Sequence, residues 1–270
     1  MDLLTIAADV ASQYRKVAQV KAMAIGGSLA SGAADNSSDI DLYAYTSSEI
    51  PMNVRTEIAM SRSDQCEIGN HFWEPGDEWI ERQTGVLVDV MFRSTSWIEE
   101  QLHRVLGRYE ASIGYSTCLW HNVLHSRLLF DTDGWFVSLQ EIARRPYPEP
   151  LRRAIVKKNH PILRDKHSSY YHQLKKAIER HDPVSVNHRL SVFLASYFDV
   201  VFAVNRLPHP GEKRLLRSVS EMCSRTPSGM ESQIESLIGS ISDDTGFLDQ
   251  VNGLVDALDD LLAQEGLLER

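Results

Sequence analysis

The chain has 270 residues, 43% of them apolar, which is enough for one large domain or two small ones with a hydrophobic core. Its formal net charge is −9, which excludes a general attraction to the phosphates of nucleic acid. The segment Ser228–Arg270 carries all of this negative charge, whereas basic residues gather between Arg144 and Lys166.

The cysteines and the N-terminal segment indicate where the protein is found. Cys66, Cys118 and Cys223 are too few and too scattered for a disulfide framework or a CxxC metal site. The first residues lack the basic start of a signal peptide, and no apolar run approaches about 18 residues. We therefore expect a soluble protein of the reducing cytoplasm with no membrane partner.

The first half of the chain alternates helical and strand-like patterns. Met1 to about Val20 predicts an amphipathic helix, and Ser94–Leu106 predicts another that Ser94 or Ser96 can cap. Leu128–Ile142 predicts a strand, an Asp-Gly turn and a helix. Runs rich in branched and aromatic residues predict four strands, at Val20–Ile25, Ile40–Tyr45, Cys66–Trp73 and Gly85–Phe92.

The second half has long helical periodicity and almost no strand signal. Arg145–Pro150, with three prolines in six residues, marks the expected domain boundary. The predicted fold class is α+β: a domain over residues 1–145 with a small mixed β-sheet flanked by helices, followed by a helical bundle over residues 146–270.

The stretch from Gly26 to Leu42 carries the chemistry. Residues i and i+2 of a strand point to the same face, so Asp39 and Asp41 project together. Two close carboxylates repel each other unless a cation lies between them, and Mg²⁺ suits such a pair because it also binds substrate phosphates. Gly26 and Gly27 let the backbone approach a ligand closely, and a helix starting at Ser28 would direct N–H groups at an anion. This combination favours phosphoryl chemistry.

Other interpretations of this stretch fit less well. A P-loop needs lysine where Ala33 stands, and an EF-hand needs glycine where Ala44 stands. The remaining alternative is that Asp39 and Asp41 lie on the solvated face of an edge strand.

The stretch resembles the signature of the polymerase-β-like nucleotidyltransferase superfamily. Gly27-Ser28 is followed by a ten-residue spacer and Asp39-Ile40-Asp41-Leu42, and Asp89 in "GVLVDVMF" matches the third carboxylate of that family. The similarity covers roughly residues 20–95, and the layout with a helical domain is similar to aminoglycoside and lincosamide nucleotidyltransferases. Ser31 departs from the pattern, since relatives often have arginine there.

The resemblance implies an enzyme that transfers a nucleoside monophosphate, with AMP from ATP expected, to a hydroxyl of a small molecule such as an antibiotic, releasing pyrophosphate. Two magnesium ions are the implied cofactors. The implied catalytic and metal-binding residues are Asp39, Asp41 and Asp89, and Glu67 is a weaker candidate for the third carboxylate. Gly27, Ser28 and Ser38 are the implied nucleotide-binding residues.

The second domain adds one candidate residue and leaves other functions open. In "NRLPHPGEKRLL" we expect a tight turn into a helix that begins with Glu212, and we expect Lys213 to reach the phosphates of the nucleotide. The alternatives are a regulatory module that binds a nucleotide or partner with little turnover, for which Ser31 is the support, and a nucleotidyltransferase acting on protein or RNA. The overall charge does not favour nucleic acid, so a small hydroxylated acceptor is the expected partner.

Overall fold

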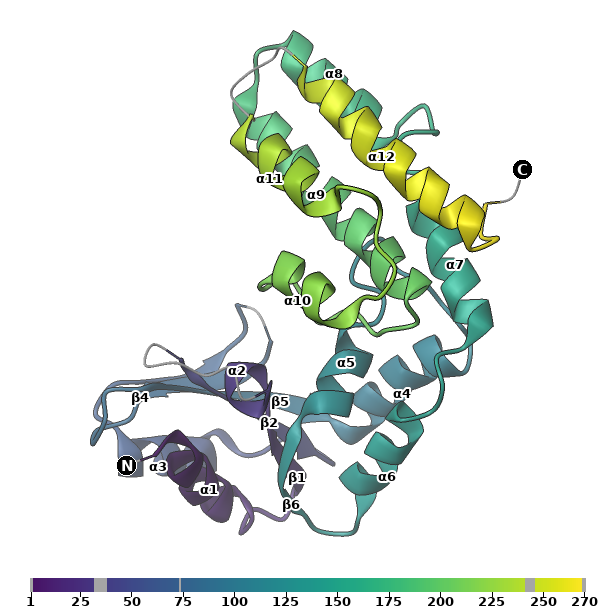
Figure 1. The fold of residues 1–270 in the computed structure, drawn as a ribbon. Helices are drawn as coiled ribbons and strands as arrows, with labels where there is room; N and C mark the ends of the chain where they lie inside the picture. The colour runs from purple at the N-terminus through teal and green to yellow at the C-terminus, as the bar shows by residue number, and fades with distance from the viewer. Residues whose placement is uncertain (1, 32–37, 73, 241–245, 269–270) are drawn as a thin grey trace. The chain divides into compact units, whose positions relative to one another are not determined.

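A computed structural model describes residues 2–31, 38–72, 74–240 and 246–268, excluding the side chains of Ser28 and Ser31. The chain forms two compact units (Figure 1). The first contains Met1–His103 and Asn122–Arg145, and the second contains Arg104–His121 and Pro146–Arg270. The units thus divide at Arg145, but residues 104–121, which the sequence analysis places in the first domain, belong to the second. Within the described ranges no helix is long and apolar enough to cross a membrane.

The described part of the first unit is built on a six-stranded mixed sheet with the order β3-β4-β5-β2-β1-β6. Strands β2 and β5 are parallel, and the other neighbouring pairs are antiparallel. Helices α4 and α5 are shared with the second unit. The elements are α1 (Leu3–Tyr14), β1 (Val20–Ile25), α2 (Gly27–Ser31), β2 (Ile40–Thr46), α3 (Met52–Arg62), β3 (Cys66–Asn70), β4 (Gly76–Ile80), β5 (Leu87–Ser94), α4 (Thr95–Leu106), α5 (Cys118–His125), β6 (Arg127–Asp131) and α6 (Trp135–Ala143).

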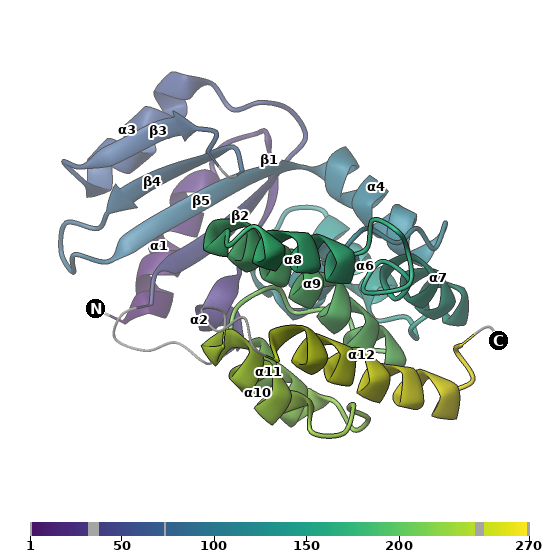
Figure 2. The ribbon, with the colours of Figure 1, turned by 90° about the horizontal axis from the view of Figure 1, so that it is seen from above.

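The two faces of the sheet have different covers. Helices α1 and α3 pack on one face, where alternate residues of the central strands join one hydrophobic core (Figures 1 and 2). From β2 this core takes Ile40, Leu42 and Ala44, and from β5 it takes Val88 and Val90. Because side chains alternate along a strand, Asp41, Tyr43 and Tyr45 lie on the other face. There Tyr45 packs against Phe136 of α6, with ring centroids 4.8 Å apart.

Most predicted elements of this unit are confirmed, with three corrections. The strands at Val20–Ile25, Ile40–Thr46 and Leu87–Ser94 are present, and Ser94 Oγ accepts from the Trp97 N–H at 3.0 Å as a helix cap. The first helix ends at Tyr14 rather than near Val20, because a turn precedes β1. The strand beginning at Cys66 ends at Asn70, and Trp73 lies outside the described residues. Strand β4 and the helices α3 and α5 were not predicted.

The second unit is helical in the described residues, as predicted. The long helix α9 is buried over its C-terminal half, from Ala195 to Val204, and packs against α7 and α8, while α12 packs against α8 and α11 (Figure 1). One hydrophobic core joins these helices. The elements are α7 (Glu149–Asn159), α8 (Tyr170–Glu179), α9 (Pro183–Val204), α10 (Leu215–Met222), α11 (Met230–Gly239) and α12 (Phe247–Gln264).

A buried carboxylate explains why residues 104–121 join this unit. Asp199, on α9, is 1% exposed and accepts from the Ser116 N–H at 3.0 Å and from Ser116 Oγ at 2.6 Å. It also accepts from Asn159 Nδ2 at 3.1 Å, and Asn159 in turn accepts from the Gly114 N–H at 2.8 Å. These bonds fasten the segment to α7 and α9, and burial raises the pKa of Asp199 to about 7.

Asp199 should make the second unit less stable as the pH rises. Between the ordinary aspartate pKa of about 3.9 and the folded pKa of about 7, the folded state binds a proton on Asp199 that the unfolded state has released. Folding is therefore most favoured at low pH, and this contribution to stability is lost as the pH rises towards 7. The free energy of unfolding should fall by up to about 1.4 kcal/mol per pH unit in this window. Asp199→Asn should remove that slope, since an amide oxygen still accepts from the Ser116 N–H. Urea unfolding at pH 5 and pH 8, compared between wild type and variant, measures it, and equal slopes would contradict it.

Candidate active site

A row of carboxylates crosses four neighbouring strands on the face opposite α1 and α3. In the register of the sheet Asp41 of β2 is paired with Asp89 of β5, and Asp89 is paired with Glu78 of β4. Glu78 is paired in turn with Glu67 of β3. Neighbouring strands lie about 4.8 Å apart, so residues paired in register carry their side chains on one face and close together. Asp39 precedes β2 and is exposed.

This row is not the solvated face of an edge strand. Strand β2 lies inside the sheet, between β5 and β1. Tyr43 and Tyr45, which share its face with Asp41, are buried. Asp41 and Asp89 are half-buried. Like charges are thus held together in a partly desolvated place, which the edge-strand alternative does not explain.

Two glycines bring the backbone of the preceding turn against this strand. A Cβ on Gly26 would lie 2.2 Å from the ring of Tyr43, and a Cβ on Gly27 would lie 1.8 Å from Asp41 Oδ2. Gly27 also has φ +57°, a conformation that favours glycine. The Gly26 N–H donates to the Asp41 carbonyl at 2.9 Å, and α2 begins at Gly27. The turn and the carboxylate therefore form one compact site.

The pKa of Asp89 shows the effect of the neighbouring carboxylates of the row. Burial, together with the charges of Glu78, Asp41, Glu74 and Asp39 in decreasing order, raises this pKa to about 7. The charges of Asp41 and Asp39 therefore reach the carboxylate of Asp89. A cation bound among them would remove the repulsion.

The chemistry of the carboxylate donors fits magnesium. Carboxylate oxygens are the ligands that Mg²⁺ prefers, and the tight seat of Asp41 on Gly27 fixes one of them. No group of three His, Cys, Asp or Glu side chains in the described residues is placed to hold a metal ion unaided. Magnesium commonly completes its shell with water and substrate phosphates, so one or two protein carboxylates suffice.

The other predicted site residues are more dispersed. Ser28 lies in α2, and its side chain is outside the description; Ser38 is half-buried and precedes β2. Lys213 belongs to the second unit and is exposed. The helix expected to begin at Glu212 begins at Leu215, because Arg214 has the left-handed φ of 55°. Lys213 is therefore in a turn.

The sequence analysis missed a polar network beside the row. Arg93, nearly buried, donates to both carboxylate oxygens of Glu74 at 2.7 Å and to Asn122 Oδ1 at 2.7 Å. Its guanidinium stacks 3.9 Å from the ring centroid of Tyr43, whose hydroxyl accepts from Asn122 Nδ2 at 2.7 Å. This network holds Tyr43 against Gly26. Its partners come from distant segments, and only the arginine within an apolar strand was a signal of it.

Replacing Gly27 with alanine should displace the carboxylate of Asp41, which packs closely against Gly27. The new methyl group would overlap Asp41 Oδ2 and would keep the unfavourable φ, so we expect loss of Mg-nucleotide binding and a stability cost of about 1–3 kcal/mol. Gly85→Ala is the matched control, because Gly85 has φ +71° in the same unit with nothing near its Cβ position. Calorimetric titration with magnesium and a non-hydrolysable ATP analogue, together with melting curves, tests this. Equal binding by both variants would contradict it.

Comparison with known proteins gives a distant likeness of fold. No family model and no curated protein matches the chain. Among solved structures, it is similar to a nucleotidyltransferase-like protein from Exiguobacterium sibiricum, with 12% identity, a TM-score of 0.45, and coverage of 97% of this chain and 75% of that one. It is also similar to a Thermotoga maritima CCA-adding enzyme complexed with tRNA, with 12% identity, a TM-score of 0.34, and coverage of 100% and 68%. At these values the chemistry of the site must be argued from its own residues.

Proposed function

We propose that the protein is a magnesium-dependent nucleotidyltransferase. It moves a nucleoside monophosphate, with AMP from ATP as the expected case, to a hydroxyl of a small molecule and releases pyrophosphate. The observation that carries this proposal is the pairing of Asp41 with Asp89 on adjacent parallel strands, directly beside the Gly27 turn. Repelling carboxylates next to a close-packed backbone turn suit a magnesium-bound triphosphate better than they suit a structural role.

The proposal gives each of the implied residues a task. Asp39, Asp41 and Asp89 would hold two magnesium ions. When bound, the metal supplies neutralisation of the triphosphate charge and alignment of the acceptor for in-line attack. Gly27 and Ser28 would hold the outer phosphates through the first N–H groups of α2, which have no partner within a helix. Ser38 would orient Asp39, and Lys213 would add a positive charge for the phosphates.

Proton removal from the acceptor hydroxyl needs a base near neutral pH. Asp89 is one candidate for this base, and a carboxylate of the second unit is the alternative. A positioned base contributes roughly 10²–10⁴-fold to such a reaction. The second unit would select the acceptor, and an antibiotic is one class of small hydroxylated molecule to test.

Two measurements on the full chain test the proposal and separate it from a regulatory module. The first is equilibrium binding of a non-hydrolysable ATP analogue with and without Mg²⁺. The second is pyrophosphate release over a panel of hydroxylated acceptors, including aminoglycosides, lincosamides, RNA and protein. Magnesium-dependent binding with release on a small acceptor supports the proposal. Tight binding without release over the whole panel would favour the module instead, and absence of binding would overturn both.

A further inference from the structure

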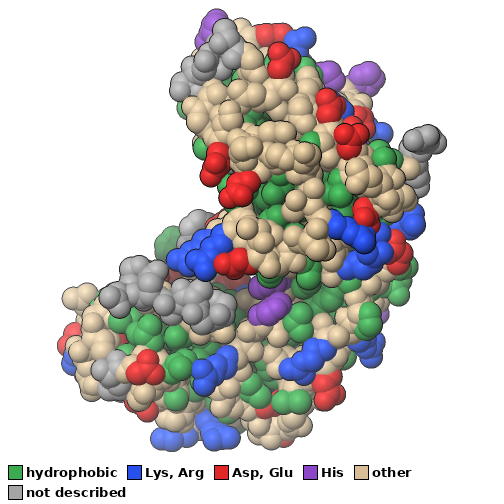
Figure 3. All heavy atoms as spheres, viewed as in Figure 1, with side chains coloured by type: hydrophobic (Ala, Val, Ile, Leu, Met, Phe, Trp, Pro, Cys, Tyr) green, Lys and Arg blue, Asp and Glu red, His purple; other side chains and the backbone are tan. Residues whose placement is uncertain are grey.

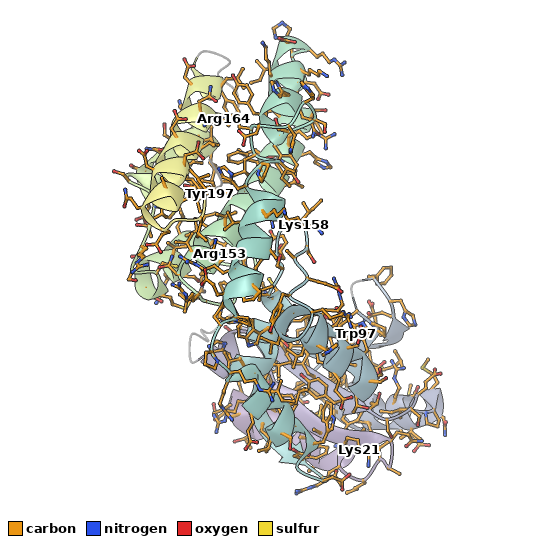
Figure 4. All side chains as sticks on the ribbon, turned by 90° about the vertical axis from the view of Figure 1, so that its right-hand side faces the viewer. Lys21, Trp97, Arg153, Lys158, Arg164 and Tyr197 are labelled. Carbon is orange, nitrogen blue, oxygen red and sulfur yellow. The ribbon has the colours of Figure 1, made fainter. Side chains whose placement is uncertain are left out.

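The structure divides the basic residues of α7 and the following turn into two groups. Arg152 is buried and donates at 2.6 Å to a glutamate at the end of α12, and Arg164 donates at 2.7 Å to an aspartate of α12. These two charges are neutralised inside the unit. Three cations of α7 stay exposed on the surface: Arg153, Lys157 and Lys158. Arg153 and Lys157 are four residues apart on this helix and so lie on one side of it, and Figure 4 labels Arg153 and Lys158 on the helix.

A cavity of about 460 Å³ lies beside these exposed cations, within the second unit. It is lined by Arg104, Glu110, Ala111, Ala154, Lys157 and Lys158. Lys158 Nζ donates to the Ala111 carbonyl at 2.7 Å, which joins α7 to the segment on the other side of the cavity. Three cations thus face one carboxylate, and that carboxylate is already bonded to Arg104 at 3.0 Å and to Arg108 at 2.7 Å. The cavity suits an anion.

An aromatic residue, Tyr109, directly precedes Glu110 of the cavity lining. Tyr109 is 37% exposed and has φ 56°, which is uncommon for a bulky residue and is held by the structure around it. The Glu110 N–H donates to the Arg104 carbonyl at 2.9 Å, and the carboxylate of Glu110 bridges Arg104 and Arg108. The segment is therefore folded back around Tyr109, whose ring stays partly exposed next to Arg108 in the sequence.

We propose that this surface binds single-stranded nucleic acid. Cations that follow a phosphate backbone, with an exposed aromatic ring on which a base can stack, are the combination that recognises unpaired strands. An acidic protein segment would use the cations but would leave the ring without a task. The proposal concerns binding alone and does not rest on nucleotide transfer. The binding surface is formed by Arg104, Arg108, Tyr109, Arg153, Lys157 and Lys158, with Glu110 and Glu149 as the carboxylates paired with its arginines.

The net charge of −9 does not oppose a local site of this kind. The acidic residues of the second unit are concentrated after Ser228, and Figure 3 shows Asp and Glu side chains spread over the face formed by α11 and α12. Electrostatic attraction between exposed groups is screened beyond about 8–10 Å at ordinary salt, so nearby charges decide what a surface attracts. A short strand on the cavity would therefore meet mainly the cations.

The test measures binding of a fluorescent oligo-uridine of about 12 nucleotides by anisotropy, over a series of salt concentrations. The double variant Lys157→Gln/Lys158→Gln should lower the slope of log affinity against log salt by about 1.4, since each phosphate contact on a single strand contributes about 0.7. The matched control is Lys175→Gln/Lys176→Gln, an adjacent exposed pair on α8 of the same unit, which should leave the slope unchanged. Tyr109→Asn should weaken binding about fivefold or more, because a base loses its stacking partner while asparagine tolerates the backbone.

Three results would overturn the proposal: no binding at low salt, equal loss in both lysine pairs, or unchanged affinity in Tyr109→Asn. A duplex of matched sequence should bind more weakly than the single strand, and equal binding would also overturn it. Oligo-thymidine beside oligo-uridine shows whether DNA or RNA is preferred, and a preference for either supports the site. Asp41→Asn should bind the strand like the wild type, so failure of nucleotide transfer and failure of this site can be told apart.

Discussion

Asp41→Asn should abolish nucleotide transfer while leaving the first unit as stable as the wild type or more stable. The substitution keeps the shape of the side chain but removes one charge from the row of Asp41, Asp89 and Glu78. A metal contributes several kcal/mol of charge stabilisation to a phosphoryl transfer, and each 1.4 kcal/mol is a factor of ten, so we expect a loss of at least about a thousandfold. Without nucleotide, removal of a repelling charge should hold or raise the melting temperature.

Two measurements on one preparation decide this prediction. Pyrophosphate release gives the loss of transfer with the best acceptor of the panel. Melting curves with and without Mg-ATP measure how much the ligand stabilises each protein. The wild type should gain about 2.7 kcal/mol at a ligand concentration a hundred times its Kd, and the variant should gain nothing. Asp133→Asn is the control, since Asp133 is an exposed carboxylate of the same unit, 2.9 Å from Lys21. A large drop in melting temperature for Asp41→Asn would mark the residue as structural.

The family resemblance implies one shared role for Asp39, Asp41 and Asp89, whereas the row of carboxylates in the structure also contains Glu78. Asp89 and Asp39 are predicted to behave like Asp41, because the charges of Asp41 and Asp39 both raise the pKa of Asp89. Glu78 also acts on that pKa and is paired with Asp89, although no family signature marks it. Its position follows from β4, and so it became visible only with the register of the sheet.

The shared face of Asp41 and Asp89 could be predicted from the sequence, because it follows from the alternation of side chains along a strand. Asp39 and Asp41 were placed on one face from their spacing, and Asp89 stood out as a charge within an apolar strand. Strand β4 was missed because Gly76, Asp77 and Glu78 are poor strand formers by themselves. What makes Asp77 acceptable there is an arginine 22 residues away, and such a partner cannot be read from a local pattern.

Long-range partners also explain the assignment of residues 104–121. The loop around Gly114 and Ser116 reads as an ordinary connection of the first domain. Its bonds go to Asn159 and Asp199, which lie in helices of the second unit. A proline-rich boundary was visible in the sequence, but a segment that returns to the other unit leaves no local signal. Arg214 has a left-handed conformation, so the helix begins later than predicted. No glycine or asparagine at this position signals that conformation in the sequence.

Asp77→Ala should destabilise the first unit by about 3–5 kcal/mol, because it leaves a buried arginine without its carboxylate. Asp77 is fully buried and accepts from Arg55 Nε at 2.9 Å, from Arg55 Nη2 and from the Gly69 N–H at 2.8 Å. The guanidinium of Arg55 also stacks 4.3 Å from the ring centroid of Phe92 and donates to the Gly76 carbonyl. Urea unfolding and melting curves measure the loss, which should reach about 10 °C in melting temperature.

Two controls show whether burial is the cause. The double variant Arg55→Met/Asp77→Asn removes both charges and keeps an acceptor for the Gly69 N–H, so it should recover at least half of the loss. Asp64→Ala breaks an exposed pair with Arg82 in the same unit and should leave the melting temperature nearly unchanged. A similar small cost for Asp77→Ala would show that the buried pair contributes no more than a surface pair.

The contrast between Asp77 and Asp41 tests the register of the sheet itself. In β5, Val90 is the register partner of Asp77 and Asp89 that of Asp41, so one step along the strand exchanges the core face for the site face. Asp77, on the core face, needs the buried guanidinium of Arg55 to keep the unit folded. Asp41, on the site face, lowers the stability of the fold by charge repulsion until a metal cation binds with the ligand. Loss of stability from Asp77→Ala together with unchanged stability in Asp41→Asn is the pattern that this register requires, and a slip of one residue in β4 or β2 would reverse it.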